Sequence, residues 1–124
     1  MTITYPSETG KRSPARREAH VPKALLDSLV GHFNPRRVIL FGSAARGEAG
    51  PDSDIDLVVV VDDDVPAERL HWRALYEARR GFPGAVDLIP CRDSVFRERA
   101  DIVGSLPWIA ITEGVVVYER ADAG

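Results

Sequence analysis

The chain has little cysteine and no long hydrophobic run. Its 124 residues include a single cysteine, Cys91, which rules out an internal disulfide and argues against a metal–thiolate cluster. No apolar segment approaches the roughly 20 residues that a helix needs to cross a bilayer. The N-terminus lacks the apolar core of a signal peptide. We therefore expect a cytoplasmic protein with no membrane association.

The chain also lacks an excess of basic residues. It has 16 Lys and Arg side chains against 19 Asp and Glu, which gives a formal net charge of -3. Proteins that hold nucleic acid neutralise its phosphates and usually show a basic excess. The charge balance therefore disfavours direct nucleic-acid binding.

The pattern of hydrophobic residues predicts one α/β domain. We expect residues 1–20 to form a mobile basic tail, with a docking arm for an acidic partner as the alternative, and residues 21–124 to fold. Hydrophobic spacing predicts helices and strands along the folded part. The predicted helices cover 22–33, 66–80 and 93 to about 103, the strands cover 38–41, 55–61, 85–90 and 115–118, and 106–112 is ambiguous. This alternation predicts a sheet of three or four strands flanked by helices, with 38–41 and 55–61 as its central strands.

Two carboxylates open the predicted strand 55–61. Asp54 and Asp56 are two positions apart, so both side chains project from the same face of a strand. Such close like charges raise the pKa of one carboxyl unless a cation lies between them, and oxygen ligands suit Mg²⁺ or Mn²⁺. The alternative is a pair of solvated carboxylates, which the buried character of the valine run 58–61 disfavours.

A third carboxylate, Asp87, interrupts an otherwise apolar predicted strand. A charge in such a strand is costly without a partner. If this strand lies beside the strand that carries Asp56, the Asp87 carboxylate completes a cluster of three acids. The alternative is an acid on an edge strand that faces water.

A Gly-Ser turn follows the predicted strand 38–41. Gly42 permits a sharp backbone path and leaves room for a phosphate to approach, and Ser43 offers a hydroxyl and an amide to the same anion. Arg46 is predicted either to contact a triphosphate or to pair with an acid such as Glu48 or Asp52. A Gly-Ser pair alone is not a specific motif. It becomes informative here because of the order of its surroundings, which is an apolar strand, Gly-Ser, Arg-Gly and then the acid pair.

Other polar and aromatic residues are weaker candidates. The histidines show no metal-ligand spacing; they are His20, His32 and His71. Residues 62–64 are expected to form a solvated acidic turn. We expect Trp72 and Tyr76 to be core or interface residues.

Together these motifs resemble the minimal nucleotidyltransferases of the DNA polymerase beta superfamily. The resemblance covers about residues 22 to 120 and rests on four segments, which are 41–47, 53–59, 86–88 and 113–119. It implies a polymerase beta-like α/β fold with a small mixed sheet. It also implies that Asp54, Asp56 and Asp87 hold two Mg²⁺ ions and that Gly42 and Ser43 hold the phosphates of ATP.

The resemblance further implies a partner protein. Small members of the family are often paired with a separately encoded helical toxin of the HEPN type, which they silence by moving AMP from ATP onto a tyrosine. We expect the chain to lack the helical acceptor domain that larger relatives carry, which would fit a partner supplied in trans. The alternatives are adenylylation of a small molecule such as an aminoglycoside, or an antitoxin that neutralises its partner by binding alone.

Overall fold

A four-stranded mixed sheet forms the centre of the protein. The computed structural model describes residues 21–42, 55–82 and 85–121. The strands are β1 (Arg37–Phe41), β2 (Ile55–Val61), β3 (Val86–Arg92) and β4 (Val115–Glu119). Their order across the sheet is β3-β2-β1-β4. Strand β1 is antiparallel to both of its neighbours, whereas β2 and β3 are parallel. The predicted central strands are therefore confirmed.

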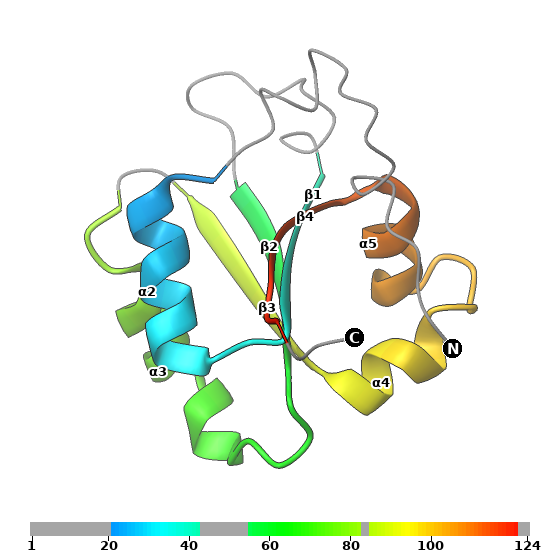
Figure 1. Cartoon of the computed structure of the whole chain (residues 1–124), viewed down its shortest axis with the longest axis horizontal. Coiled ribbons are helices and arrows are strands. Elements are labelled where there is room, and N and C mark those ends of the chain that lie inside the picture. Colours follow the sequence, from blue (N-terminus) through cyan, green and yellow to red (C-terminus); the bar gives the residue numbers. More distant parts are fainter. Residues whose placement is uncertain (1–20, 43–54, 83–84, 122–124) are drawn as a thin grey trace.

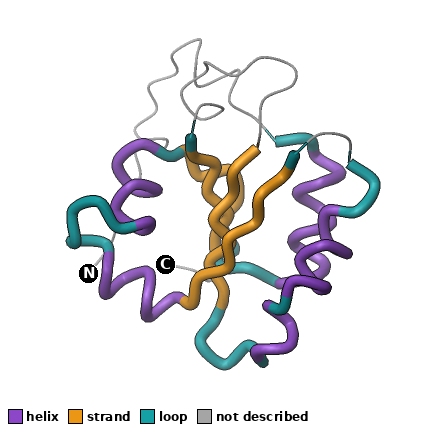
Figure 2. The backbone as a smooth tube through the Cα atoms, turned by 180° about the vertical axis from the view of Figure 1, so that it is seen from behind, coloured by secondary structure: helices purple, strands orange, loops and turns teal. Residues whose placement is uncertain are grey.

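Helices cover both faces of this sheet. The helices of the described residues are α2 (Lys23–Phe33), the 3-10 helix η2 (Ala67–Leu70), α3 (Trp72–Arg79), α4 (Asp93–Arg99) and α5 (Leu106–Glu113). Helices α2 and α3 lie on one side of the sheet, and α4 and α5 lie on the other (Figure 1). The view from behind shows the same three layers (Figure 2). A parallel β2–β3 pair needs a crossover between its strands, and η2 with α3 provides it.

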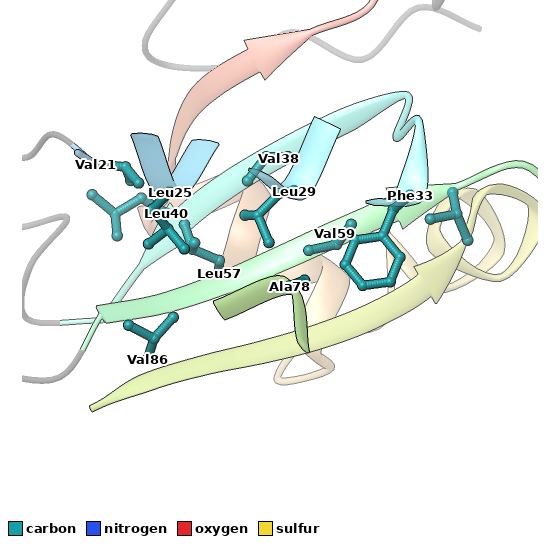
Figure 3. Packing of buried hydrophobic residues seen from close by; sticks show 11 residues of the cluster. Val21, Leu25, Leu29, Phe33, Val38, Leu40, Leu57, Val59, Ala78 and Val86 are labelled. Atoms are coloured by element: carbon teal, nitrogen blue, oxygen red, sulfur yellow. The ribbon is translucent and has the colours of Figure 1, made fainter. Parts of the chain in front are cut away.

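The unbroken valine run of β2 is explained by these two helical layers. Alternate residues of a strand point to opposite faces, and every residue from Leu57 to Val61 is fully buried. Leu57, Val59 and Val61 pack with α2 and with Ala78 of α3, and Figure 3 shows the centre of this cluster. Val58 and Val60 pack on the other face with Phe96 of α4 and Ala110 of α5. A strand covered on both faces needs no polar positions, so its sequence does not alternate.

The predicted helix 66–80 is interrupted at His71. This residue is extended (φ -72°, ψ 155°), and its side chain accepts a hydrogen bond from the backbone N–H of Arg73, which caps α3. The helical pattern was correct on either side of the break. The prediction failed at His71 because a side-chain cap at a helix start competes with helix continuation.

Helix α4 is shorter than expected, and the ambiguous segment is helical. Helix α4 begins at Asp93 and ends at Arg99, not near Val103. The ambiguous segment is the α-helix α5, whose N-cap Ser105 accepts a hydrogen bond from the Trp108 N–H. A hydroxyl that satisfies a free N–H is the usual start of a helix.

Trp72 and Tyr76 are surface residues of α3. Their exposed fractions are 63% and 47%. Of the two alternatives, the structure excludes a place in the core, and an interface role stays a prediction. The guanidinium groups of Arg73 and Arg79 lie over the rings of Trp72 and Tyr76, at 5.4 and 5.3 Å from the ring centroids.

Asp62 begins the expected turn, since its carbonyl oxygen accepts a hydrogen bond from the Val65 N–H at 3.3 Å, but its side chain is held by two arginines instead of being merely solvated. Its carboxylate accepts hydrogen bonds from Arg36 at 2.9 Å and from both terminal nitrogens of Arg120 at 3.1 and 3.2 Å. These bonds, those of Arg120 first, lower the pKa of the Asp62 carboxyl. The three residues come from the ends of different strands, so the turn pattern of residues 62–64 could not reveal the contact.

This cluster predicts a loss of stability in acid. A carboxyl whose pKa is lower in the folded protein stabilises it fully above the pKa of the unfolded chain, near 3.8. That contribution is lost as the pH falls through the folded-state pKa. We expect Asp62→Asn to be less stable than wild type at about pH 6 and the difference to shrink at about pH 3. Urea unfolding at both pH values measures it, and a difference that is independent of pH would contradict the prediction.

Candidate active site

One end of the sheet brings the candidate residues together. Strands β2 and β3 are parallel, so they begin side by side, and the antiparallel β1 ends next to the beginning of β2. In the observed register, Asp56 pairs with Phe41 of β1 on one side and with Asp87 of β3 on the other. Gly42 follows Phe41 directly. This end of the sheet is the upper one in Figure 1.

Asp56 and Asp87 lie on the same face of the sheet. Asp56 shares its face with Val58 and Val60, which pack toward α4 and α5, because residues two apart in a strand point the same way. Directly paired residues of neighbouring strands also share a face, at a strand spacing of about 4.8 Å. The condition that the Asp87 strand lies beside the Asp56 strand is therefore met.

The exposure of Asp87 reconciles the two interpretations of this residue. Strand β3 is at the edge of the sheet, and Asp87 is exposed. The fold can therefore keep its charge in water without a buried partner. The carboxylate faces solvent and at the same time neighbours Asp56, so it is accessible to a molecule that approaches the edge of β3.

Gly42 lies in close contact with Asp56. The backbone of Gly42 has φ +81°, and a Cβ built on it would lie 2.6 Å from Asp56 Oδ2. The sequence predicted room for a phosphate at this glycine, but the room on the Cβ side is taken by the Asp56 carboxylate. Positive φ and the adjoining carboxylate both favour glycine at this position. The Gly-Ser pair was visible in the sequence, but the contact between Gly42 and the Asp56 carboxylate was not.

Three of the predicted site residues lie outside the described residues. They are Ser43, Arg46 and Asp54. Within the described part of the chain, no three His, Cys, Asp or Glu side chains form a group that could hold a metal ion. The described pair, Asp56 and Asp87, supplies oxygen donors on one face, and oxygen donors are the ligands that a hard divalent cation prefers. The donor chemistry therefore fits Mg²⁺.

The structure disfavours a catalytic or metal role for Cys91, His32 and His71, and His20 lies outside the described residues. Burial raises the pKa of the Cys91 thiol, which disfavours the nucleophilic thiolate. His71 caps α3, and the Nδ1 atom of His32 lies 2.9 Å from the Ser28 carbonyl oxygen of its own helix. A pocket of about 360 Å³ beside Asp62 and His32 lies at the opposite end of β2 from Asp56.

The fold and the acid pair define an α/β protein with carboxylates at the strand ends beside a glycine turn. The sequence of the nucleotidyltransferase domain family matches residues 23–109, which is more than half of the chain and includes Gly42, Asp56 and Asp87. The chain belongs to this nucleotidyltransferase domain family.

Two solved structures share the fold. One is the crystal structure of a candidate nucleotidyltransferase from Sulfolobus solfataricus, with 22% identity, a TM-score of 0.53 and coverage of 92% of this chain and 95% of that chain. The other is the crystal structure of a toxin-antitoxin with AMP-PNP, with 20% identity, a TM-score of 0.55 and coverage of 82% of this chain and 76% of that chain. No curated protein matches the chain significantly. The expected α/β fold, a small mixed sheet flanked by helices, is thus confirmed.

In the part of the chain that the structure describes, no helix is both long and apolar enough to span a lipid bilayer.

Proposed function

We propose that the protein transfers AMP from ATP to a hydroxyl group of a separately encoded HEPN-type toxin, most simply a tyrosine hydroxyl, and so acts as the antitoxin of a toxin–antitoxin pair. The observation that carries the proposal is the pairing of Asp56 with Asp87 beside Gly42 in a member of the nucleotidyltransferase domain family. The shared fold with a toxin-antitoxin structure that contains AMP-PNP supports the nucleotide and the partner class.

The residues divide into three roles in this proposal. Asp54, Asp56 and Asp87 hold two Mg²⁺ ions, which, when bound, neutralise phosphate charge and stabilise the attacking and leaving oxygens. Gly42 and Ser43 bind the β- and γ-phosphates through the turn after β1. Arg46 contributes a positive charge to the triphosphate or holds this turn.

The proposed transfer is an in-line displacement at the α-phosphorus of ATP. The acceptor oxygen forms a bond to the α-phosphorus, and the bond from that phosphorus to the oxygen bridging it to the β-phosphorus breaks, so that pyrophosphate leaves. The acceptor hydroxyl gives up its proton to Asp87 or to water. The acceleration comes mainly from positioning and from charge stabilisation.

The location of Asp87 supports a macromolecular acceptor. The residue is exposed on the edge strand β3, where the side chain of another protein can reach it from solvent. With ATP as the donor, the proposal places the reaction in the cytoplasm, where ATP is abundant. The acidic net charge of -3 argues against a nucleic-acid acceptor.

Intact-mass spectrometry of the toxin tests the proposal. The purified partner is incubated with this protein, ATP and Mg²⁺, and the control reaction contains the Asp54→Ala/Asp56→Ala protein. We expect the toxin to gain one or more AMP units with wild type only, because the variant lacks two of the proposed metal ligands. Fragmentation of the modified toxin then identifies the acceptor residue.

Two outcomes would redirect the assignment. If the double variant still neutralises the toxin in cells, the protein acts by binding and transfer is not required. If wild type binds ATP but leaves the toxin unmodified, the same assay with an aminoglycoside as acceptor tests the small-molecule alternative.

A further inference from the structure

The contact between Gly42 and Asp56 points to a second role for the glycine. A methyl group at position 42 would lie 2.6 Å from Asp56 Oδ2, 3.6 Å from its Cγ and 3.8 Å from its Cβ. We propose that Gly42 is a positioning residue. Because glycine has no side chain, the Asp56 carboxylate can lie against its α-hydrogen and keep the orientation that metal binding needs. This role is separate from phosphate binding, and it rests on the proposed metal role of Asp56.

The surroundings make the carboxylate the part that has to move. Strand β2 is the second strand of the sheet, with β1 and β3 on either side, and Leu57 and Val58 are fully buried. The backbone of Asp56 is therefore held by both neighbouring strands and by packing on both faces. A side chain added at Gly42 meets the flexible end of Asp56 first, so the aspartate rotates while the strand stays in place.

This argument separates two effects of the substitution Gly42→Ala. Rotation displaces only the end of a short side chain and leaves the buried strand in place, so we expect the main loss of stability to come from placing alanine at positive φ. Rotation of the carboxylate, however, moves its two oxygens away from the positions proposed to bind the metal. Misplacement of a positioned group by about 1 Å is enough to impair a catalytic site strongly. We therefore expect a large functional effect with a modest effect on stability.

The chain offers a matched control at Gly104. This glycine has φ +87°, close to the value at Gly42, and nothing lies within 4 Å of an added Cβ. The substitution Gly104→Ala therefore introduces the same backbone strain without a steric contact. The difference between the two alanine variants isolates the contact with Asp56.

Binding of Mn²⁺ without nucleotide provides the measurement. Mn²⁺ accepts the same oxygen ligands as Mg²⁺, and electron paramagnetic resonance detects its free form. We expect Gly42→Ala to weaken Mn²⁺ binding by about 10- to 100-fold, the usual effect of removing a residue that orients a metal ligand. Gly104→Ala is expected to bind Mn²⁺ like wild type. The urea midpoints of Gly42→Ala and Gly104→Ala are expected to shift by similar amounts.

The Asp56→Asn variant makes the two proposals distinguishable. If Asp56→Asn weakens Mn²⁺ binding but Gly42→Ala does not, the positioning role is wrong and the metal role of Asp56 stands. If Gly42→Ala instead weakens only ATP binding in EDTA, Gly42 acts on the phosphates and the positioning role is again wrong. If Asp56→Asn leaves Mn²⁺ binding unchanged, the metal role of Asp56 fails and the inference fails with it.

A double variant covers poor folding of Gly42→Ala. If Gly42→Ala proves less stable than Gly104→Ala, the clash can be removed in the Asp56→Ala background. There, adding Gly42→Ala is expected to shift the urea midpoint only as much as Gly104→Ala shifts that of wild type. A larger shift in that background would overturn the contact on which the inference depends.

Discussion

The substitution Asp87→Asn is expected to lower the rate of AMP transfer by about 10²- to 10³-fold, the usual loss when one electrostatic contact is removed from an active site. Asparagine keeps the shape of the side chain but loses the negative charge that the proposed metal and proton roles require. Because Asp87 is exposed on an edge strand, the free energy of unfolding should change by no more than about 0.5 kcal/mol. Toxin mass spectra taken over a time course give the rate.

The control for this prediction is Asp101→Asn, which makes the same chemical change at an exposed position after α4. We expect this variant to transfer AMP at the wild-type rate. A fall in kcat with little change in the KM for ATP would fit a role of Asp87 toward the acceptor. Wild-type transfer by Asp87→Asn would remove this residue from the mechanism, even if Asp56 proved essential.

The substitution Phe96→Ala is expected to destabilise the fold by about 3–5 kcal/mol. Phe96 is fully buried and joins α4 to the sheet through Ile39, Val58 and Val60. Removal of the ring leaves a cavity on the face to which Asp56 also belongs. The expected loss is a large share of the roughly 5–15 kcal/mol that stabilises a typical domain. Urea unfolding followed by circular dichroism measures this loss.

The neighbouring residue Val95 provides the comparison for Phe96. It belongs to the same helix but is 39% exposed, so Val95→Ala is expected to change the free energy of unfolding by less than about 0.5 kcal/mol. Equal effects of the two substitutions would mean that the cluster around Phe96 contributes little to stability. In that case α4 would be held in place mainly by the ion pairs of Asp93, which lies 3.5 Å from Arg36 and from Arg37.

The sequence by itself determined most of the local structure. The continuous run of β2 and the helical spacing of α2 both follow from the spacing of hydrophobic residues. The order of Gly42, Asp56 and Asp87 along the chain also predicted the class of chemistry. These properties depend on residues close to one another in sequence, so they can be predicted from local sequence patterns.

Helix bounds were less accessible to the same reasoning. The break at His71 and the end of α4 at Arg99 depend on capping and on how each turn meets the sheet. Hydrophobic period continues through such points, because the side chains on both sides of the break still face the core.

Only the tertiary structure showed which residues from distant parts of the sequence are neighbours. Strand order and register place Asp87 next to Asp56 across 31 positions of sequence, and the same register brings the Asp56 carboxylate against Gly42. The ends of three strands likewise bring Arg36, Asp62 and Arg120 into one cluster. The physical reason is that pairing between strands is a long-range choice, set by which faces are buried together, whereas a sequence pattern records only which face each residue prefers.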